Sequence, residues 1–131
     1  MNKLSEHLIG LKVSVYFNLH KHVWSVKALE GEHKGRVVHH TDHIILKDAV
    51  QKVSEAGRQR VLREQVKNVH ASIVGTVSGL ESCEGCVATL YYNPYITPRF
   101  VYKDSGKEFL YSPYVEMIAE GRLVKAYPED S

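Results

Sequence analysis

The chain has 131 residues, of which 44% are hydrophobic and 24% charged, a composition typical of a folded globular protein rather than a disordered one. This length predicts one domain, residues 1–131, that can bury a core without a stabilising disulfide or metal. The formal net charge of +2 is too small for a protein that coats long nucleic acid, so any anion site must be local.

The sequence also predicts a cytoplasmic protein that does not associate with membranes. No apolar run approaches the roughly 18 residues that a membrane span needs, and the first residues, MNKLSEHLIG, lack the apolar core of a signal peptide. The two cysteines, Cys83 and Cys86 in CEGC, are therefore expected to be reduced thiols rather than a structural disulfide.

The first part of the chain has the two-residue period of half-buried strands. Residues 12–29 predict a strand, a tight turn and a second strand, because hydrophobic and polar residues alternate from Val13 to His20. After a polar turn, EGEHKG, residues 36–46 predict a third strand that places His39 and His43 on one face.

An amphipathic helix is expected next, beginning after Ser54, whose hydroxyl can cap it. At the helical period, the core-facing stripe consists of Leu62, Val66 and Val69. A separate basic face consists of Arg60, Arg63 and Lys67, with Arg58 at the border of the stripe. The end of this helix, between Glu64 and Val69, stays open, because KNVHASIVGTV fits a strand equally well.

The remainder predicts short strands around turns, in VATLYYNPYI, FVYKDSGKEFLY and VEMIAEGRLVKAY. Roughly seven strands and one helix predict an α+β fold. We expect a mainly antiparallel, strongly twisted or barrel-like sheet with one short basic amphipathic helix.

The basic helix face is the main candidate for a binding site, because guanidinium and ammonium groups match phosphate oxygens. The predicted ligand-binding residues are Arg58, Arg60, Arg63, Lys67, His70, Asn18, Tyr92 and Arg99. The alternative is an ordinary solvated helix face, with Arg58 in a salt bridge to Asp42 or Asp48.

The histidines and cysteines permit two further sites. Imidazoles titrate near neutral pH, so an acid and base for metal-independent phosphodiester cleavage could come from His20, His39, His43 and His70. Cys83 and Cys86 have the spacing of a zinc knuckle, but the chain has no second pair of this kind. Incidental thiols in a turn fit better, and no metal is expected.

The stretch LYYNPYITPRFVY interleaves tyrosines, Tyr92 among them, with Arg99. Aromatic rings next to a cation suit base stacking and phosphate neutralisation. They suit the core of a sheet or a homo-oligomer interface equally well.

Three segments, VYFNLHKHVWSV, GRQRVLREQVKNVHA and YNPY, resemble a family of small accessory proteins encoded by bacteriophages and other mobile elements. The resemblance covers about residues 12–127 and carries no catalytic motif, so it gives no residue a role. It implies a phage-borne protein that acts in the host-cell cytoplasm, in host takeover or in counter-defence.

Three functions stay open at this point. We favour a binding module for a phosphate-bearing ligand, either a small or cyclic nucleotide such as a host immune signal or a short single-stranded nucleic acid. The first alternative is a histidine-based, metal-independent ribonuclease or phosphodiesterase, and the second is a module that binds a host protein. No cofactor is expected, and we expect a homo-oligomer.

Overall fold

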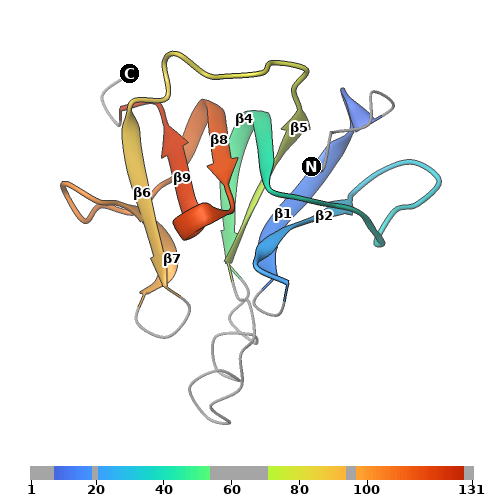
Figure 1. Cartoon of the computed structure of the whole chain (residues 1–131), viewed down its shortest axis with the longest axis horizontal. Helices are drawn as coiled ribbons and strands as arrows, with labels where there is room; N and C mark the ends of the chain where they lie inside the picture. The colour runs from blue at the N-terminus through green and yellow to red at the C-terminus, as the bar shows by residue number, and fades with distance from the viewer. Residues whose placement is uncertain (1–7, 19–20, 54–70, 94–96, 129–131) are drawn as a thin grey trace, which may run out of the picture.

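A computed structural model describes residues 8–18, 21–53, 71–93 and 97–128. They form one nine-stranded antiparallel sheet with the strand order β3-β2-β1-β5-β4-β8-β9-β6-β7. The strands are β1 (Lys12–Asn18), β2 (Val23–Ala28), β3 (Val37–Thr41), β4 (His43–Val53), β5 (Ala71–Val77), β6 (Ala88–Asn93), β7 (Thr97–Tyr102), β8 (Tyr111–Ile118) and β9 (Leu123–Ala126). Figure 1 shows β1 and β2 on one side of the molecule and β6 and β7 on the other, with β4, β5 and β8 between them.

The strand, turn and strand predicted for residues 12–29 are confirmed as β1 and β2. Val13, Val15 and Phe17 are buried, whereas the residues that alternate with them are partly exposed. Phe17 lies opposite Trp24 in the pairing of the two strands, and their rings meet edge to face with centroids 5.2 Å apart. The two-residue period therefore identified both the strands and the side that faces the core.

The third predicted strand is interrupted by a corner at Asp42, so the single strand expected for residues 36–46 is wrong. β3 ends at Thr41 at the edge of the sheet, and β4 begins at His43 in its middle. The Thr41 hydroxyl donates to the His43 carbonyl oxygen at 2.8 Å and accepts from the His43 N–H at 3.2 Å. The Ala119 N–H donates to the Asp42 carbonyl oxygen at 2.8 Å. These bonds satisfy the backbone where it leaves one strand for the other.

The predicted α+β class is wrong, because the described residues form an open, nearly all-antiparallel sheet. Within those residues the one complete helical element is the three-residue 3-10 helix η2 (Glu120–Arg122), which joins β8 to β9. The α+β prediction rests on one amphipathic stretch, and residues 54–70, which contain it, lie outside the described part of the chain.

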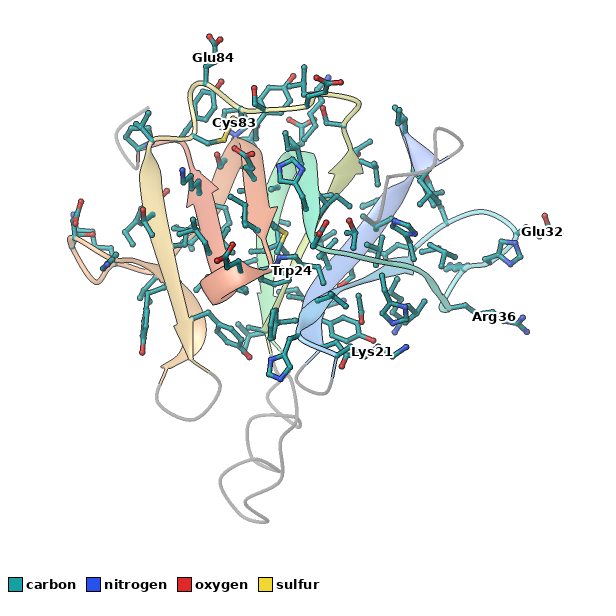
Figure 2. The ribbon with its side chains drawn as sticks, viewed as in Figure 1. Lys21, Trp24, Glu32, Arg36, Cys83 and Glu84 are labelled. Carbon is teal, nitrogen blue, oxygen red and sulfur yellow. A yellow bond between two sulfur atoms is a disulfide. The ribbon has the colours of Figure 1, made fainter. Side chains whose placement is uncertain are left out.

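The described sheet builds its core from its own strands, which is why no described helix is needed to cover it. Trp24 of β2, Phe100 of β7 and Met117 of β8 belong to one buried cluster, although β2 and β7 lie near opposite ends of the strand order. Trp24 is fully buried and lies near the middle of the molecule in Figure 2. Curvature of the sheet thus brings distant strands together around a shared core.

The two edge strands of the sheet, β7 and β3, differ in what binds their outer edges. The half-buried Gln51 of β4 docks on β7 and on the segment that follows it. Its Nε2 donates to the carbonyl oxygens of Phe100 in β7 at 3.2 Å and of Phe109 beyond β7 at 2.8 Å. Its Oε1 accepts the Phe100 N–H. The backbone that follows β7 also binds its edge, since the Phe109 N–H donates to the Phe100 carbonyl oxygen at 3.0 Å and the Tyr102 N–H donates to the Lys107 carbonyl oxygen at 2.8 Å. Gln51 and this segment together occupy backbone groups that a further strand would otherwise bind. β3 pairs with β2 and with no other described strand.

Candidate nucleic-acid interface

The outer side of strands β1 to β5, opposite the core, forms a polar surface that we call the lysine face. Its residues are Lys12, Ser14, Tyr16, Lys27, Lys47, Val50, Lys52, Ser72, Val74 and Thr76, together with Tyr111 of β8. The two-residue period places them there. On β5, for example, Ser72 and Thr76 alternate with the buried Ile73 and Val77.

Strand register spreads the lysines over this face. Lys12 lies opposite Thr76, which lies opposite Lys47. Two strand spacings therefore separate Lys12 from Lys47, about 10 Å. Lys27 lies opposite Ser14 at one side, and Lys52 follows Lys47 along β4 at roughly 15 Å. The lysines therefore lie around an area in which Ser14, Ser72 and Thr76 adjoin the half-buried Val74, which lies opposite Ser14 and Val50.

A bulge in β4 shapes the centre of the lysine face. The register of β4 against β5 shifts between Lys47 and Val50, and Asp48 has a φ of 52°. Gly75 of β5 lies beneath this bulge, where an added Cβ would be 2.9 Å from the Lys47 carbonyl oxygen. Glycine at this position lets the two backbones approach closely, and the bulge turns Lys47 and Asp48 toward solvent.

Exposed apolar and aromatic groups adjoin the lysines. Tyr111 is 53% exposed and lies opposite Val50, which is 39% exposed. The Tyr111 hydroxyl donates to Asp48 Oδ1 at 3.1 Å. This hydrogen bond is the main reason that the pKa of Tyr111 is raised above 10.0. Like an ordinary tyrosine, the phenol is neutral at physiological pH. A neutral aromatic ring beside cations is suited to stacking on a base.

The lysine face has an excess of positive charge. Within strands β1 to β5, Asp48 is the only carboxylate. Among the described residues, no carboxylate forms an ion pair with Lys12, Lys27, Lys47 or Lys52. Ammonium groups that lack a protein counter-charge are the groups that neutralise phosphates in nucleic-acid complexes.

The structure separates three of the residues expected to bind the ligand. Asn18 ends β1 and accepts the Lys21 N–H at 2.9 Å, which shapes the turn to β2. Tyr92 is buried in β6 and stacks on Phe100 with ring centroids 4.6 Å apart. Arg99 of β7 pairs with Glu108. Asn18 therefore lies in the opposite half of the sheet from the other two.

The two described histidines of the predicted catalytic group do not share one strand face. His39 is in β3 opposite the buried Val26, whereas His43 begins β4, after the corner. His43 Nε2 lies 2.7 Å from Glu116 Oε2 of β8. This arrangement gives His43 a carboxylate partner and places it apart from His39 in the strand order.

Most of the predicted basic site falls on residues that the structure does not describe. These are Arg58, Arg60, Arg63, Lys67 and His70, and the proposed catalytic His20 falls there too. Their part in any site stays a prediction.

Cys83 and Cys86 form a disulfide, which differs from the reduced thiols expected. They lie in the loop between β5 and β6, at the upper rim of Figure 2. Between them, Gly85 packs against Tyr127, whose Cζ would be 2.4 Å from an added Cβ. Within the described residues, no group of three or more His, Cys, Asp or Glu side chains is placed to hold a metal ion.

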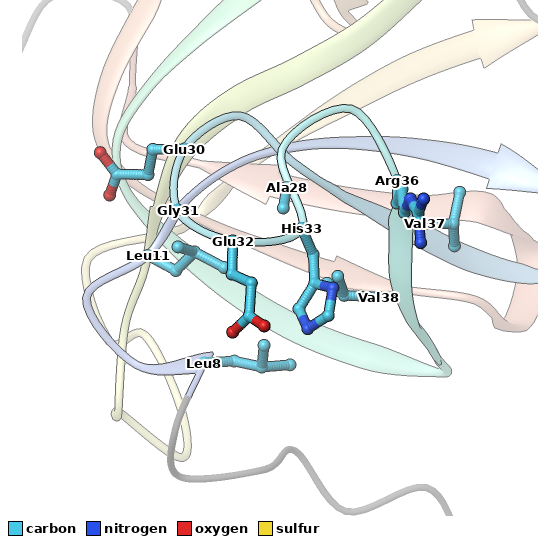
Figure 3. A pocket seen from close by; sticks show the side chains of 10 residues that line it. All are labelled: Leu8, Leu11, Ala28, Glu30, Gly31, Glu32, His33, Arg36, Val37 and Val38. Carbon is cyan, nitrogen blue, oxygen red and sulfur yellow. The ribbon is translucent and has the colours of Figure 1, made fainter.

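A hollow of about 490 Å³ lies away from the lysine face, between the turn that precedes β1 and the loop between β2 and β3 (Figure 3). Its lining includes the apolar Leu8, Leu11 and Val38, and Glu32 and His33 extend toward Leu8 from the loop. Glu30 also contributes a carboxylate. Arg36 lines the hollow as well. With two carboxylates against one guanidinium, this hollow is a poorer phosphate site than the lysine face.

Comparison with known proteins identifies the family. The family described as Mycobacterium phage L5 gene 82 protein matches residues 7–125. The gene 82 protein of Mycobacterium phage L5 itself is 42% identical over 106 residues, covering 76% of this chain and 84% of that protein. The chain belongs to the phage L5 gene 82 protein family. No solved structure matches it.

Membership confirms the phage resemblance and makes this a phage accessory protein. The matched residues 7–125 include every residue assigned to the lysine face. The described part of this phage protein also holds no helix with the length and apolarity needed to cross a bilayer.

The lysine face of this gene 82 family member is not among the sites predicted from the sequence. Its signal is present in KDAVQKV, where Lys47 and Lys52 lie on the outer side of β4. The bulge shifts the alternation between them, so a strict two-residue period fails there. The partners of these lysines on β1 and β5 come from distant sequence, and only the register of the sheet brings them together.

Proposed function

We propose that this phage accessory protein binds a short single-stranded nucleic acid on the lysine face. Lys12, Lys27, Lys47 and Lys52 hold phosphates, and Tyr111 stacks on a base. The observation that supports the proposal is the charge of this face. Strands β1 to β5 contain four lysines and one carboxylate, and that carboxylate, Asp48, accepts the Tyr111 hydroxyl.

The shape of the face favours an extended ligand over a small nucleotide. Small molecules bind in concave sites that bury most of their surface, whereas the lysine face is an open strand surface with cations roughly 10–15 Å apart. An extended phosphate chain can contact several such cations at once. The small number of lysines limits the ligand to a short strand, consistent with a whole-chain charge of +2.

In an infected cell this activity would be exercised in the host cytoplasm, on a short strand of the phage that it protects or a short strand of the host that it sequesters. The second role would make the protein an anti-defence factor.

The test is fluorescence anisotropy of labelled single-stranded DNA and RNA oligonucleotides across a series of salt concentrations. Each phosphate neutralised on a single strand contributes about −0.7 to the slope of log affinity against log salt. The triple variant Lys12→Gln, Lys47→Gln and Lys52→Gln should therefore bind weakly, with a slope shallower by about 2.

A matched control removes the same charge elsewhere, with Lys103→Gln, Lys107→Gln and Lys125→Gln in the other half of the sheet. This variant should retain most of the affinity and the slope of the wild type. Equal losses in the two variants would mean that net charge, not the lysine face, drives binding. Absence of binding to either nucleic acid at low salt would eliminate the proposal.

A second candidate function, metal-independent RNA cleavage, has one supporting observation. Glu116 holds the imidazole of His43 at 2.7 Å, and such a carboxylate can orient a histidine that takes a proton from a ribose hydroxyl. Incubation of a labelled RNA oligonucleotide with the wild type and with His43→Ala tests it. Cleavage should be lost in His43→Ala, and an intact oligonucleotide in both samples would end this candidate.

A further inference from the structure

The loop between β5 and β6 contains a disulfide between residues only three positions apart, Cys83 and Cys86. Cross-links stabilise a fold mainly by closing long loops, so one this short adds comparatively little to stability. In a reducing cytoplasm, disulfides that do form are usually transient and redox-active. The purpose of this disulfide is therefore better sought in its chemistry than in the stability of the fold.

The two sulfur-bearing residues have different environments. Cys86 is buried, with 4% of its surface exposed, whereas Cys83 is only partly buried. A thiolate that attacks the disulfide must reach one sulfur from solvent, and access decides which one it reaches. The geometry makes Cys83 the sulfur that is attacked and Cys86 the sulfur that leaves.

A site for the reduced form of Cys86 is already present. Its Sγ lies 3.4 Å from the Tyr114 carbonyl oxygen of β8. A disulfide sulfur has no hydrogen to donate, but the thiol formed on reduction can donate to this oxygen. The loop thus offers a hydrogen-bond acceptor that only the reduced state uses.

The shape of the loop does not depend on the sulfur–sulfur bond alone. The Cys86 N–H donates to the Cys83 carbonyl oxygen at 3.3 Å, and the Val87 N–H donates to the Gly85 carbonyl oxygen at 3.0 Å. Gly85 also packs against Tyr127, next to the strands that carry the loop. The disulfide can therefore open without unfolding the sheet.

We infer that Cys83 and Cys86 form a reversible thiol–disulfide exchange site whose reaction partner is a protein dithiol, such as a reductase with two neighbouring cysteines. A thiolate of the partner attacks Cys83 Sγ, the Cys83–Cys86 bond breaks, and Cys86 leaves as a thiolate that takes up a proton. The second thiol of the partner then attacks the mixed disulfide and releases Cys83 as a thiolate, which is protonated in turn. Two electrons pass from the partner, which becomes a disulfide, to the protein, which becomes a dithiol.

This assignment does not depend on the proposed ligand of the lysine face, so nucleic-acid binding and thiol exchange can fail separately. The first test treats the oxidised full-length protein with dithiothreitol under native conditions, followed by alkylation and intact-mass measurement. Two alkyl groups should be added while the circular dichroism of the fold is retained. Alkylation that occurs only after a denaturant is added would overturn the inference.

The second test separates the two sulfurs with the matched variants Cys86→Ser and Cys83→Ser, each compared with the wild type for thermal midpoint. Reaction with an aromatic disulfide reagent should be at least about tenfold faster for Cys83, in Cys86→Ser, than for Cys86, in Cys83→Ser, because access controls the rate. Equal or reversed rates would contradict the assigned roles. The first test remains decisive if either variant fails to fold.

Discussion

The two halves of the sheet differ in how their charged side chains are paired and in how their edge strands are protected. In strands β6 to β9, Arg99 pairs with Glu108, and Glu116 lies opposite Lys125 and pairs with His43 of β4. In strands β1 to β5, the lysines outnumber the single carboxylate and form no ion pair with a described carboxylate. The charged groups named in β6 to β9 thus have charged neighbours, one of them on β4, whereas the lysines of β1 to β5 have no described counter-charge.

The edges of the sheet follow the same division. β7 contains Pro98, which has no N–H to offer a further strand, and Gln51 occupies backbone groups of Phe100 and Phe109. β3, with the sequence VVHHT, has neither proline nor lysine among its five residues. Charged residues and proline protect edge strands from unwanted pairing. The less protected edge and the lysines without a described counter-charge therefore lie in the same half of the sheet, and the homo-oligomer expected from the sequence stays a prediction.

Removing the side chain that docks β7 should have the largest effect on stability. Gln51→Ala removes two donated hydrogen bonds and one accepted one, and leaves half-buried backbone groups of Phe100 and Phe109 without these partners. We expect a loss of about 2–4 kcal/mol in the free energy of unfolding, measured by urea denaturation. The adjacent, exposed Lys52→Ala is the control and should change little. A loss in Gln51→Ala no larger than that of the control would show that β7 needs no docking.

The next effect concerns the bulge beneath the lysine face. In Gly75→Ala the new methyl group would meet the Lys47 carbonyl oxygen at 2.9 Å and Leu46 Cβ at 3.1 Å. Because backbone must shift to relieve this contact, we expect about 1–3 kcal/mol of destabilisation, together with weaker nucleic-acid binding.

The matched control is Gly79→Ala, where the nearest atom is the end of the Ile9 side chain at 3.2 Å. A side chain on the surface can move aside, so this variant should be close to the wild type in both measurements. Normal affinity in a destabilised Gly75→Ala would separate the bulge from the binding site.

Sequence periodicity predicted individual strands well and their assembly poorly. The alternation in β1 and the turn in VEMIAEGRLVKAY both correspond to observed elements, since they depend on neighbours in the chain. The corner at Asp42 depends on a bond from Ala119, and the docking of β7 depends on Gln51, 49 residues from Phe100. Such contacts leave no periodic signal.

The lysine face was missed in the sequence for the same reason. The prediction concentrated on consecutive cations in residues 54–70, because a helix gathers such residues on one face. A sheet gathers residues from separate strands instead, so Lys12 and Lys47 become neighbours of Thr76 only once the register is known. Tyr92 and Tyr111 illustrate the difference, since the first is buried in the core and the second is exposed.

A smaller effect is expected from breaking the charge pair that joins β8 to β4. Glu116→Gln removes the partner of His43, whose side chain is 38% exposed, and leaves Lys125 opposite a neutral residue. Because solvent screens such pairs, thermal and urea unfolding should show a loss of about 0–1 kcal/mol. The exposed Glu120→Gln is the control for a change of charge alone. A loss well above this range would mean that the pair acts as a buried one, in keeping with the 15% exposure of the Glu116 side chain.

The smallest effect concerns Asp48, the one carboxylate of strands β1 to β5. Asp48 accepts the Tyr111 hydroxyl and raises the pKa of Tyr111 above 10.0, chiefly through that hydrogen bond. The raised pKa belongs to the folded state. The hydrogen bond therefore stabilises the fold fully at pH values below the pKa of an unfolded tyrosine, about 10, and this stabilisation is lost as the pH rises through the pKa of Tyr111 in the folded protein. Ultraviolet titration of the phenolate should therefore show one tyrosine that ionises earlier in Asp48→Asn than in the wild type, and no such change when the variant also carries Tyr111→Phe. An unchanged titration in Asp48→Asn would show that the hydrogen bond does not control Tyr111. The phenol would be neutral at physiological pH with or without this bond, so the bond serves instead to fix the position of the Tyr111 ring and to place the only carboxylate of these strands on a protein donor.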